Sequence, residues 1–585
     1  MRWIYGAFPH DRKYLHKTVV GWTRWSCRAD RLGAPMRPLL AILLLSACGD
    51  KEPRDAGGDS VVVADDCDEG DPAVGGEEVP YDGVDNDCAA STLDDDLDGD
   101  GFALEDDCDD GDPALGGDEV INDGIDNDCD PSTPDDAVDV DGDGVAAAED
   151  CDDNNPLVWL APDKRAGSLQ ASFVDFCTGY CERGLVGDLE LSSATPQDVA
   201  SLGCLTSVGG SVTVEYNASL TNLAGLENLS SVGDDLDIRH NVALMSLGSL
   251  ENLTYVGKDL DISDNGALSS LSGLEALSFV GQNLFIDYNP LLTSLSALEG
   301  LSFVGWSIII CDNPSLTSLS GLNGIPSLDG SLDICENPLL MSLSGLEGLS
   351  FVGGDLAVYA NGGLTSFSGL EGVSSVGGDL YIVEFDLVDL TSFKALSSVS
   401  GDLSIHYSNT LTSLAGLEGL SYVGGDLEID SNDALTSLSG LDGLSSLGGR
   451  LLVYQNPSLT SLSGLEGLSS VGGSVTVMHN EALTSFSGLD GLSSIGASLT
   501  VEDNGALTSF SGLDALSSIG RILIVENNAA LTSLTGLDGL SSVGMSVQFI
   551  DNLNLCEDDV DALVAQLTSF PGTVTNTGNL GTCPS

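Results

Sequence analysis

The sequence has few basic residues and few aromatic ones. It contains 18 Lys+Arg against 91 Asp+Glu, and Phe, Trp and Tyr make up 5% of its 585 residues. Eight of the basic and two of the acidic residues lie in residues 1–47, which leaves 10 against 89 and a formal charge of −79 on the rest. Such a field repels nucleic acids and attracts Ca²⁺ or basic partners. We therefore expect no nucleic-acid partner, although the charge is also explained by solubility alone.

The N-terminal apolar run, Leu39–Leu45, is too short to cross a bilayer but suits a signal peptide. It ends in Leu-Ser-Ala-Cys48, which resembles the lipobox of bacterial lipoproteins. The resemblance implies cleavage before Cys48 and acylation of its sulfur. It thus predicts a lipid-anchored envelope protein of a Gram-negative bacterium, at the outer membrane or cell surface. Residues 1–35 are expected to be an upstream extension or, alternatively, a long charged region of the signal; residues 48–64 follow as a linker.

Zinc-type C-x-x-C pairs are absent, and Cys177 and Cys181 have no nearby histidine, so no zinc site is expected. Twelve cysteines remain once Cys27 and Cys48 are set aside. An even number predicts six disulfides in an oxidising compartment, with a connectivity that spacing leaves open. These cysteines are Cys67, Cys88, Cys108, Cys129, Cys151, Cys177, Cys181, Cys204, Cys311, Cys335, Cys556 and Cys583.

Residues 65–160 are so acidic that cations are needed to hold them in a compact fold. Two loops have aspartates at positions 1, 3, 5 and 12 and a glycine at position 6, the spacing with which carboxylates surround Ca²⁺. No EF-hand helices flank these loops, and an unliganded acidic linker is the alternative. The predicted calcium ligands are Asp96, Asp98, Asp100 and Asp107 in the first loop and Asp139, Asp141, Asp143 and Asp150 in the second.

A second acidic motif, Asp-Gly-x-Asp-Asn-Asp-Cys, ends at Cys88 and again 41 residues later at Cys129. Together with the Asp-Cys-Asp elements, it resembles the MopE-type metal-binding modules of bacterial surface proteins. The resemblance implies a surface protein, and pairing Cys67 with Cys88 and Cys108 with Cys129 would close each module. No histidine occurs between His16 and His240, so oxygen ligands favour calcium over copper. The motif adds Asp82, Asp85, Asp87, Asp123, Asp126 and Asp128 as candidate metal ligands.

A 24-residue repeat occupies most of the remaining chain. Each repeat combines a Leu-x-Ile alternation, typical of a strand with one buried face, with leucines spaced by three, which suits a chain that turns corners. Because one coil cannot bury its own leucines, successive coils must stack. The pattern resembles receptor L-domain leucine-rich repeats. It predicts an all-β, right-handed parallel β-helix of about 15 coils, with a cap and first coil at 161–210, the solenoid at 211–555 and a cap at 556–585.

An asparagine follows the strand in almost every coil, from Asn217 to Asn552, and its amide is expected to form a ladder with adjacent coils. Asn409 is included in this ladder, whereas Phe385 stands where an asparagine is expected and the spacing slips. We therefore predict a distorted coil, with any bend near residues 384–410. In the C-terminal cap, residues 558–567 have a short helical pattern, and Cys556 and Cys583 bracket the segment.

Surface positions of the repeat are of two kinds, uniform and variable. The uniform kind is an acidic residue after the Gly-Leu leucine, from Glu227 to Asp538, which is expected either to be screened by solvent or to bridge divalent cations. The variable kind precedes the asparagines and could carry specificity. Its notable members are Tyr216, Arg239, His240, Tyr288, Tyr359, Tyr407, Tyr454, Met478 and His479.

Two further features of the repeat suggest sites. Tyr255, Phe279 and Phe303 are 24 residues apart and close to Trp306, so they should stack on successive coils. Such a strip is either simple packing or a ligand-binding surface for sugar rings or a protein. Cys311 and Cys335, also 24 residues apart, are expected to be outward neighbours able to form an inter-coil disulfide.

Catalysis finds little support, because His240 and His479 are ten coils apart and no insertion forms a large groove. We expect a non-enzymatic, monomeric surface lipoprotein whose calcium-binding stalk presents the solenoid for adhesion or for binding a glycan or protein ligand. The alternative is a purely structural or cation-storing envelope component. A polysaccharide-processing β-helix enzyme is the least favoured alternative.

Overall fold

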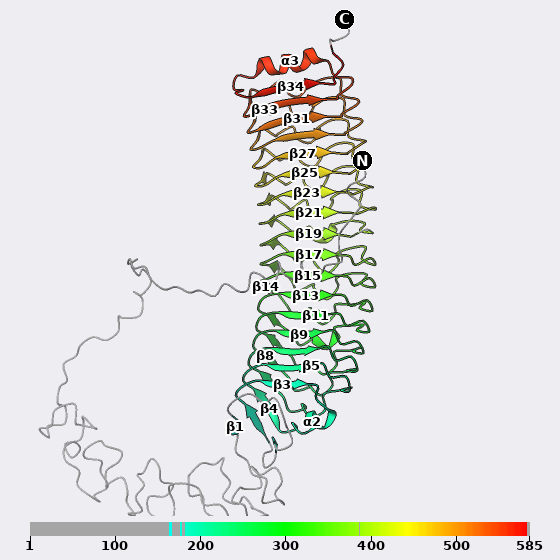
Figure 1. The fold of residues 1–585 in the computed structure, drawn as a ribbon, viewed down its shortest axis with the longest axis vertical. Coiled ribbons are helices and arrows are strands. Elements are labelled where there is room, and N and C mark those ends of the chain that lie inside the picture. The colour runs from blue at the N-terminus through cyan, green and yellow to red at the C-terminus, as the bar shows by residue number, and fades with distance from the viewer. Residues whose placement is uncertain (1–162, 166–175, 178–181, 385, 582–585) are drawn as a thin grey trace, which may run out of the picture. The chain divides into compact units, whose positions relative to one another are not determined.

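The computed structural model describes residues 163–165, 176–177, 182–384 and 386–581. The chain divides into two compact units, 1–135 and 136–585, and all the described residues belong to the second. They form a parallel β-solenoid of about 16 turns with little helix. Figure 1 shows the strands of one sheet stacked in chain order, with helix α3 (Glu557–Gln566) beyond the last strand. The all-β solenoid is therefore confirmed, with slightly more coils than expected.

Each turn contributes one strand to a long sheet, in which every pairing is parallel. Its strands are β3 (Leu189–Ser192), β5 (Val212–Glu215), β7 (Leu236–Arg239), β9 (Leu260–Ser263), β11 (Leu284–Asp287), β13 (Ile308–Cys311), β15 (Leu332–Cys335), β17 (Leu356–Tyr359), β19 (Leu380–Val383), β21 (Leu403–His406), β23 (Leu427–Asp430), β25 (Leu451–Tyr454), β27 (Val475–Met478), β29 (Leu499–Glu502), β31 (Ile522–Glu526), β33 (Ser546–Ile550) and β34 (Thr573–Thr577).

Mostly shorter strands form two further parallel sheets along a second side of the coils. The first short sheet contains β1 (Asp163–Arg165), β2 (Arg183–Leu185), β4 (Leu205–Val208), β6 (Ser231–Val232), β8 (Tyr255–Val256), β10 (Phe279–Val280) and β12 (Phe303–Val304). The second contains β14 (Ser327–Leu328), β16 (Phe351–Val352), β18 (Ser375–Val376), β20 (Ser398–Val399), β22 (Tyr422–Val423), β24 (Ser446–Leu447), β26 (Ser470–Val471), β28 (Ser494–Ile495), β30 (Ser518–Ile519) and β32 (Ser542–Val543).

The leucine pattern builds the core as the sequence predicts. In the coil that begins with β23, Leu427 and Ile429 point inward from the strand and are fully buried. The leucines spaced by three then turn the chain, since the N–H of Leu444 donates to the carbonyl of Leu441 at 2.9 Å and so keeps the next leucine inside. Burying one leucine side chain stabilises the fold by about 2 kcal/mol, so stacking is driven mainly by these columns.

Glycine is required where adjacent coils approach closely. Gly440 has φ +115°, and a Cβ there would lie 2.0 Å from the carbonyl oxygen of Leu414 in the preceding coil. Gly448 has an ordinary φ, but its Cβ would lie 2.1 Å from the carbonyl oxygen of Gly424. Both positions recur along the chain, so a side chain would force the coils apart.

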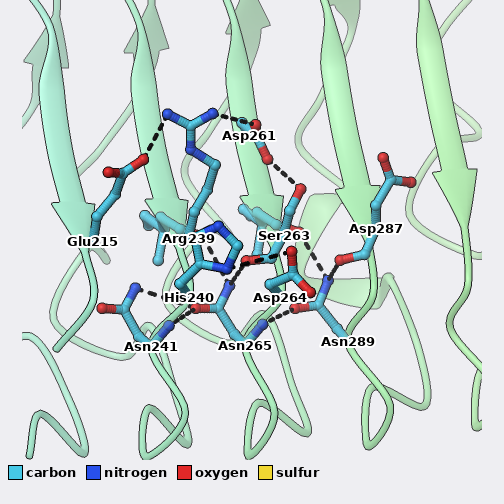
Figure 2. Close-up of polar contacts among 12 residues, drawn as sticks. Glu215, Arg239, His240, Asn241, Asp261, Ser263, Asp264, Asn265, Asp287 and Asn289 are labelled. Carbon is cyan, nitrogen blue, oxygen red and sulfur yellow. Dashed lines mark hydrogen bonds and ion pairs between the residues drawn. The ribbon is translucent and has the colours of Figure 1, made fainter. Parts of the chain in front are cut away.

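The asparagine ladder is confirmed. Asn313 is fully buried, and its Oδ1 accepts from the backbone N–H of Asn289 at 3.1 Å. Its Nδ2 donates to the carbonyls of Ile286, at 2.7 Å, and Cys311, at 3.0 Å. Figure 2 shows the same arrangement for Asn241, whose Nδ2 and N–H contact Oδ1 of Asn265. Each amide thus satisfies backbone groups that turn inward between strands and are hidden from water.

The predicted irregularity near residue 385 is a one-residue deletion. Glu384, 23 residues after Asn361, takes the asparagine position, and its buried Oε1 accepts from Asn361 N and Nδ2, both at 2.9 Å. Ser408 occupies the next position and is buried, whereas Asn409 is exposed, so assigning Asn409 to the ladder was wrong. Strands β19 and β21 still pair in full register, because the shortening falls in the turn. A further local change is a 3₁₀ turn, η2 (Thr391–Phe393), like η1 (Ser296–Leu298) earlier.

The ends of the solenoid are closed by short helices. At the N-terminal end, α2 (Pro196–Ala200) begins with a capping box formed by Thr195 and Asp198, and a disulfide joins Cys177 to Cys204. At the C-terminal end, α3 lies close to the predicted helical segment and buries Val560 and Leu563.

The status of the C-terminal cysteine pair differs from that of the N-terminal one. Cys556 is buried with a free thiol, and Cys583 lies outside the described residues, so their pairing stays a prediction. No helix among the described residues is long and apolar enough to cross a membrane. The Cys177–Cys204 bond is typical of proteins in an oxidising, extracytoplasmic compartment.

Candidate functional site

One face of the solenoid lacks the repeat. From β3 to β33 of the long sheet, the two inward columns contain only Leu, Val and Ile apart from Phe549, but the outward columns change from coil to coil. We call these outward columns, and the residue that follows each strand, the variable face. Its first column reads Glu190, Thr213, Asp237, Asp261, Phe285, Ile309, Asp333, Ala357, Tyr381, Ser404, Glu428, Leu452, Thr476, Thr500, Ile524 and Gln548.

The residue after each strand from β3 to β33, apart from β19, has an unusual backbone conformation. Fifteen such residues, from Ser193 to Asp551, have φ between 52° and 60°, and none of them is glycine. For a residue with a Cβ, this left-handed conformation costs about 1 kcal/mol. Asp and Asn tolerate it well, but Tyr216, Ala360 and Gln455 do not share that preference. Side chains are therefore kept in this column at a conformational cost, although the chain uses glycine freely elsewhere.

Near its N-terminal end, the variable face holds a half-buried ion cluster (Figure 2). The Arg239 guanidinium contacts Glu215 at 2.6 Å, Asp237 at 3.3 Å and Asp261 at 3.4 Å. Asp261 also accepts a hydrogen bond from Ser263. Burial nevertheless raises the pKa of Asp237 to about 6, because desolvation outweighs the attraction of Arg239. One arginine thus only partly compensates three carboxylates.

Further along the variable face, two carboxylates lie beside a disulfide, and neither of them pairs with a cation among the described residues. Cys311 and Cys335, paired residues of β13 and β15, form the expected inter-coil bond, and both are largely buried. Asp287 is 5% exposed, and its Oδ1 accepts from the N–H of Cys311 at 2.9 Å. Burial raises the pKa of Asp287 to about 8 and that of Asp333 to about 7. Burial, followed by the charges of these and neighbouring acids, raises the pKa of Tyr359 to about 12.

All three histidines of the described residues lie on this face, and each contacts an aspartate of the next coil and an aromatic ring of the preceding one. The sequence interpretation overlooked His406, because taking Asn409 as the ladder residue obscured its strand position two residues before Ser408. The pairs are His240–Asp264 (3.4 Å), His406–Asp430 (3.4 Å) and His479–Asp503 (3.6 Å), with Tyr216, Tyr381 and Tyr454 as the respective aromatic neighbours.

The predicted aromatic strip lies elsewhere, on the first short sheet. Tyr255, Phe279 and Phe303 stack with ring centroids 4.9 and 4.8 Å apart and nearly parallel planes. Each interior ring face is covered by its neighbour, so the strip offers mainly ring edges to a ligand. Trp306 is 50% exposed and faces Gly330 of the next coil. The strip thus packs as predicted but is separate from the variable face.

The uniform carboxylates have a local structural role that neither sequence interpretation included. Ten of the twelve accept a hydrogen bond from the N–H of the glycine two residues earlier, at 2.7 to 3.3 Å, as Glu466 does from Gly464. Glu251 and Glu299 are the exceptions, and they follow Ser249 and Ala297 instead of glycine. These carboxylates thus cap a strained turn, which explains their recurrence without a bound cation.

The candidate metal and lipid sites lie outside the described residues. This applies to all fourteen aspartates predicted to bind calcium, to Cys48 and to Cys67, Cys88, Cys108 and Cys129. Within the described part of the chain, no group of three or more His, Cys, Asp or Glu side chains is arranged to hold a metal ion.

Comparison with known proteins gives little beyond the fold. No family model matches the sequence, and no curated protein does either. Among solved structures, the chain is similar to a leucine-rich repeat protein from Eubacterium ventriosum, with 12% identity, 68% of this chain and 90% of that chain covered, and a TM-score of 0.14. The repeat and the stacked strands themselves define a leucine-rich-repeat-like β-solenoid over residues 183–577.

Proposed function

We propose that this protein is a non-enzymatic binding protein of the bacterial cell surface, whose solenoid presents the variable face to a ligand. One observation carries the proposal: variation between coils is concentrated on adjacent columns of one sheet, while the inward columns of that sheet and the capping positions repeat. Packing alone requires only the repeated positions. A surface whose composition changes at every step offers the many different contacts that specific recognition needs.

The proposal extends to the N-terminal part of the chain. Cys48 carries a lipid anchor, and the acidic modules bind Ca²⁺ through the aspartates of their two 12-residue loops and the Asp-Gly-x-Asp-Asn-Asp motif. The supporting observation is the calcium-loop spacing from Asp96 to Asp107, repeated from Asp139 to Asp150. Calcium titration of the full chain by calorimetry tests this part. Heat at micromolar to millimolar Ca²⁺ that is lost when Asp96 and Asp139 become Asn supports it, and no heat contradicts it.

The binding role is tested by screening the full-length protein against arrays of glycans and of envelope proteins, with and without Ca²⁺. A triple variant, Tyr216→Ala, Tyr407→Ala and His479→Ala, removes two exposed rings and one half-exposed ring from the variable face. Tyr255→Ala with Tyr422→Ala removes similarly exposed rings from the short sheets and serves as the matched control. We expect a ligand that the triple variant loses and the control retains.

Other outcomes of this screen point elsewhere. A ligand lost only in the control variant would assign binding to the short sheets, with the aromatic strip as the first candidate. Its exposed ring edges suit a protein partner better than face-on stacking of sugars. No ligand from any array would contradict the binding role and favour the structural or cation-storing alternative.

A further inference from the structure

Aromatic side chains gather at the middle of the variable face, on three successive coils. The rings of Tyr359 and Tyr381 meet edge to face, with centroids 6.1 Å apart and planes at 73°. The ring centroids of Tyr381 and His406 are 5.8 Å apart, and those of His406 and Tyr407 are 6.2 Å apart. We call these four residues the tyrosine cluster. Tyr381 and Tyr407 are 40% and 44% exposed, so much of their ring surface faces solvent.

Next to this cluster, the strand register leaves a position with only a methyl group. Ala357 pairs with Asp333 on one side and with Tyr381 on the other, so it lies between them in one outward column. Tyr359, two residues further along the same strand, borders the position from the side. Neighbouring strands are about 4.8 Å apart, so the backbone positions of Asp333 and Tyr381 are separated by about 10 Å across Ala357. Asp333 and two tyrosines thus flank the smallest side chain of the column.

The acidic residue next to Ala357 in the column, Asp333, has no cationic partner in the described part of the chain. Among the described residues, no side chain makes an ion pair or hydrogen bond with the carboxylate of Asp333. Burial first, and then the charge of Asp355, raises the pKa of Asp333 to about 7, as expected for a carboxylate that lacks a cation. On the opposite side, burial first, and then the charges of Tyr407 and Glu428, raises the pKa of the Tyr381 hydroxyl.

Building on the binding role of the variable face, we propose that the space over Ala357 binds the guanidinium group of an arginine side chain from a basic protein partner. A guanidinium can pair with the Asp333 carboxylate through two parallel hydrogen bonds and at the same time lie against the rings of Tyr359 and Tyr381. A lysine ammonium matches the charge but not the planar shape.

The flanking charges favour a basic segment over a single free cation. Acidic residues continue on both sides of the site, with Asp312 and Glu336 before it and Glu428 and Asp430 after it. Glu428 and Asp430 are already engaged, since Arg450 approaches Glu428 at 3.4 Å and His406 approaches Asp430 at 3.4 Å. The remaining negative field attracts further Lys or Arg residues of the same segment and raises its association rate.

The test uses the full-length protein and a fluorescent Gly/Ser peptide with three arginines, at about 0.15 M salt to limit unspecific attraction. Two matched peptides replace arginine with citrulline, which keeps the shape without the charge, or with lysine, which keeps the charge without the plane. We expect the arginine peptide to bind about tenfold more tightly than the citrulline peptide, with the lysine peptide between them.

Two protein variants locate the site. Ala357→Leu fills the space without removing a charge or a ring, and Tyr381→Ala removes one wall; each should weaken the arginine peptide about tenfold. Tyr422→Ala, an equally exposed tyrosine on the second short sheet, should not change the affinity. Amide exchange over β15 to β21 checks that the variants fold. If Tyr381→Ala does not fold, Ala357→Leu alone provides the test.

Equal affinity for the arginine and citrulline peptides would overturn the inference. So would arginine binding that Ala357→Leu leaves unchanged, because attraction would then come from the general field and not from this site. Either result leaves the binding role of the variable face standing if the array screen finds a ligand that depends on Tyr216, Tyr407 and His479. Failure of the screen together with failure of the peptide would overturn both.

Discussion

Asp287 should make the solenoid less stable as the pH rises. Its carboxyl is 5% exposed, and its pKa is raised from an ordinary value near 3.9 to about 8, mainly by burial. Between these two values, the folded protein keeps a proton that the unfolded chain has released. The free energy of unfolding therefore falls with increasing pH in that window and levels off above pH 8. Protonation at low pH removes the buried charge, so the contribution is most favourable near pH 4.

The magnitude follows from the shift. One retained proton changes the free energy of unfolding by about 1.4 kcal/mol per pH unit, so the whole window corresponds to a loss on the order of 5 kcal/mol. Asp287→Asn removes the titration but keeps an amide oxygen that can accept from the N–H of Cys311. We expect the variant to equal the wild type at pH 4.5 and to be more stable by several kcal/mol at pH 8.5.

Amide exchange followed by mass spectrometry suits this test, because a repeat array need not unfold in one step. Peptides covering β11 and β13 should exchange more slowly in Asp287→Asn than in the wild type at pH 8.5, after correction for intrinsic rates, and equally at pH 4.5. Asp433→Asn, at an exposed aspartate further along, is the control. A stability difference that does not change with pH, or a wild type more stable at pH 8.5, would refute the reasoning.

Two further predictions concern the repeat itself. Asn313→Ala removes three buried hydrogen bonds and should lower the free energy of unfolding, measured in urea, by about 3 to 5 kcal/mol. Asn409→Ala, at an exposed site, should have little effect. Equal effects of the two substitutions would contradict the ladder. Gly488→Ala combines φ +110° with a Cβ only 2.2 Å from a carbonyl oxygen, so its melting temperature should fall by several degrees or more. Gly505→Ala, with no atom within 4 Å, should melt like the wild type.

The errors in the sequence-based interpretation have a common origin. Asn409 was assigned to the ladder by residue type, but the chain is one residue shorter there, and Glu384 and Ser408 take the buried positions. A carboxylate can accept the same N–H hydrogen bonds as an asparagine, so residue type alone did not reveal which residue takes the ladder position. The deletion could have been found from the strand residues Leu380 and Leu403, which are 23 residues apart and in register.

The repeat by itself determined which residues are neighbours one coil apart. A period of 24 places Tyr255 under Phe279, Cys311 beside Cys335 and each ladder asparagine next to another, because stacking coils of equal length leaves no other register. The same regularity decided which residues are inside, since only stacked coils can bury leucines at every turn.

The tertiary structure alone decided which columns lie side by side within a coil and how deeply each is buried. The path of the turns places the outward columns of the long sheet together and the aromatic strip on another sheet, and this path depends on glycine conformations and capping carboxylates that a period does not reveal. Burial of Asp287 and the position of Ala357 between Asp333 and Tyr381 depend on several neighbours at once. A repeat specifies contacts along the stack, whereas the chemistry of the variable face depends on contacts across it.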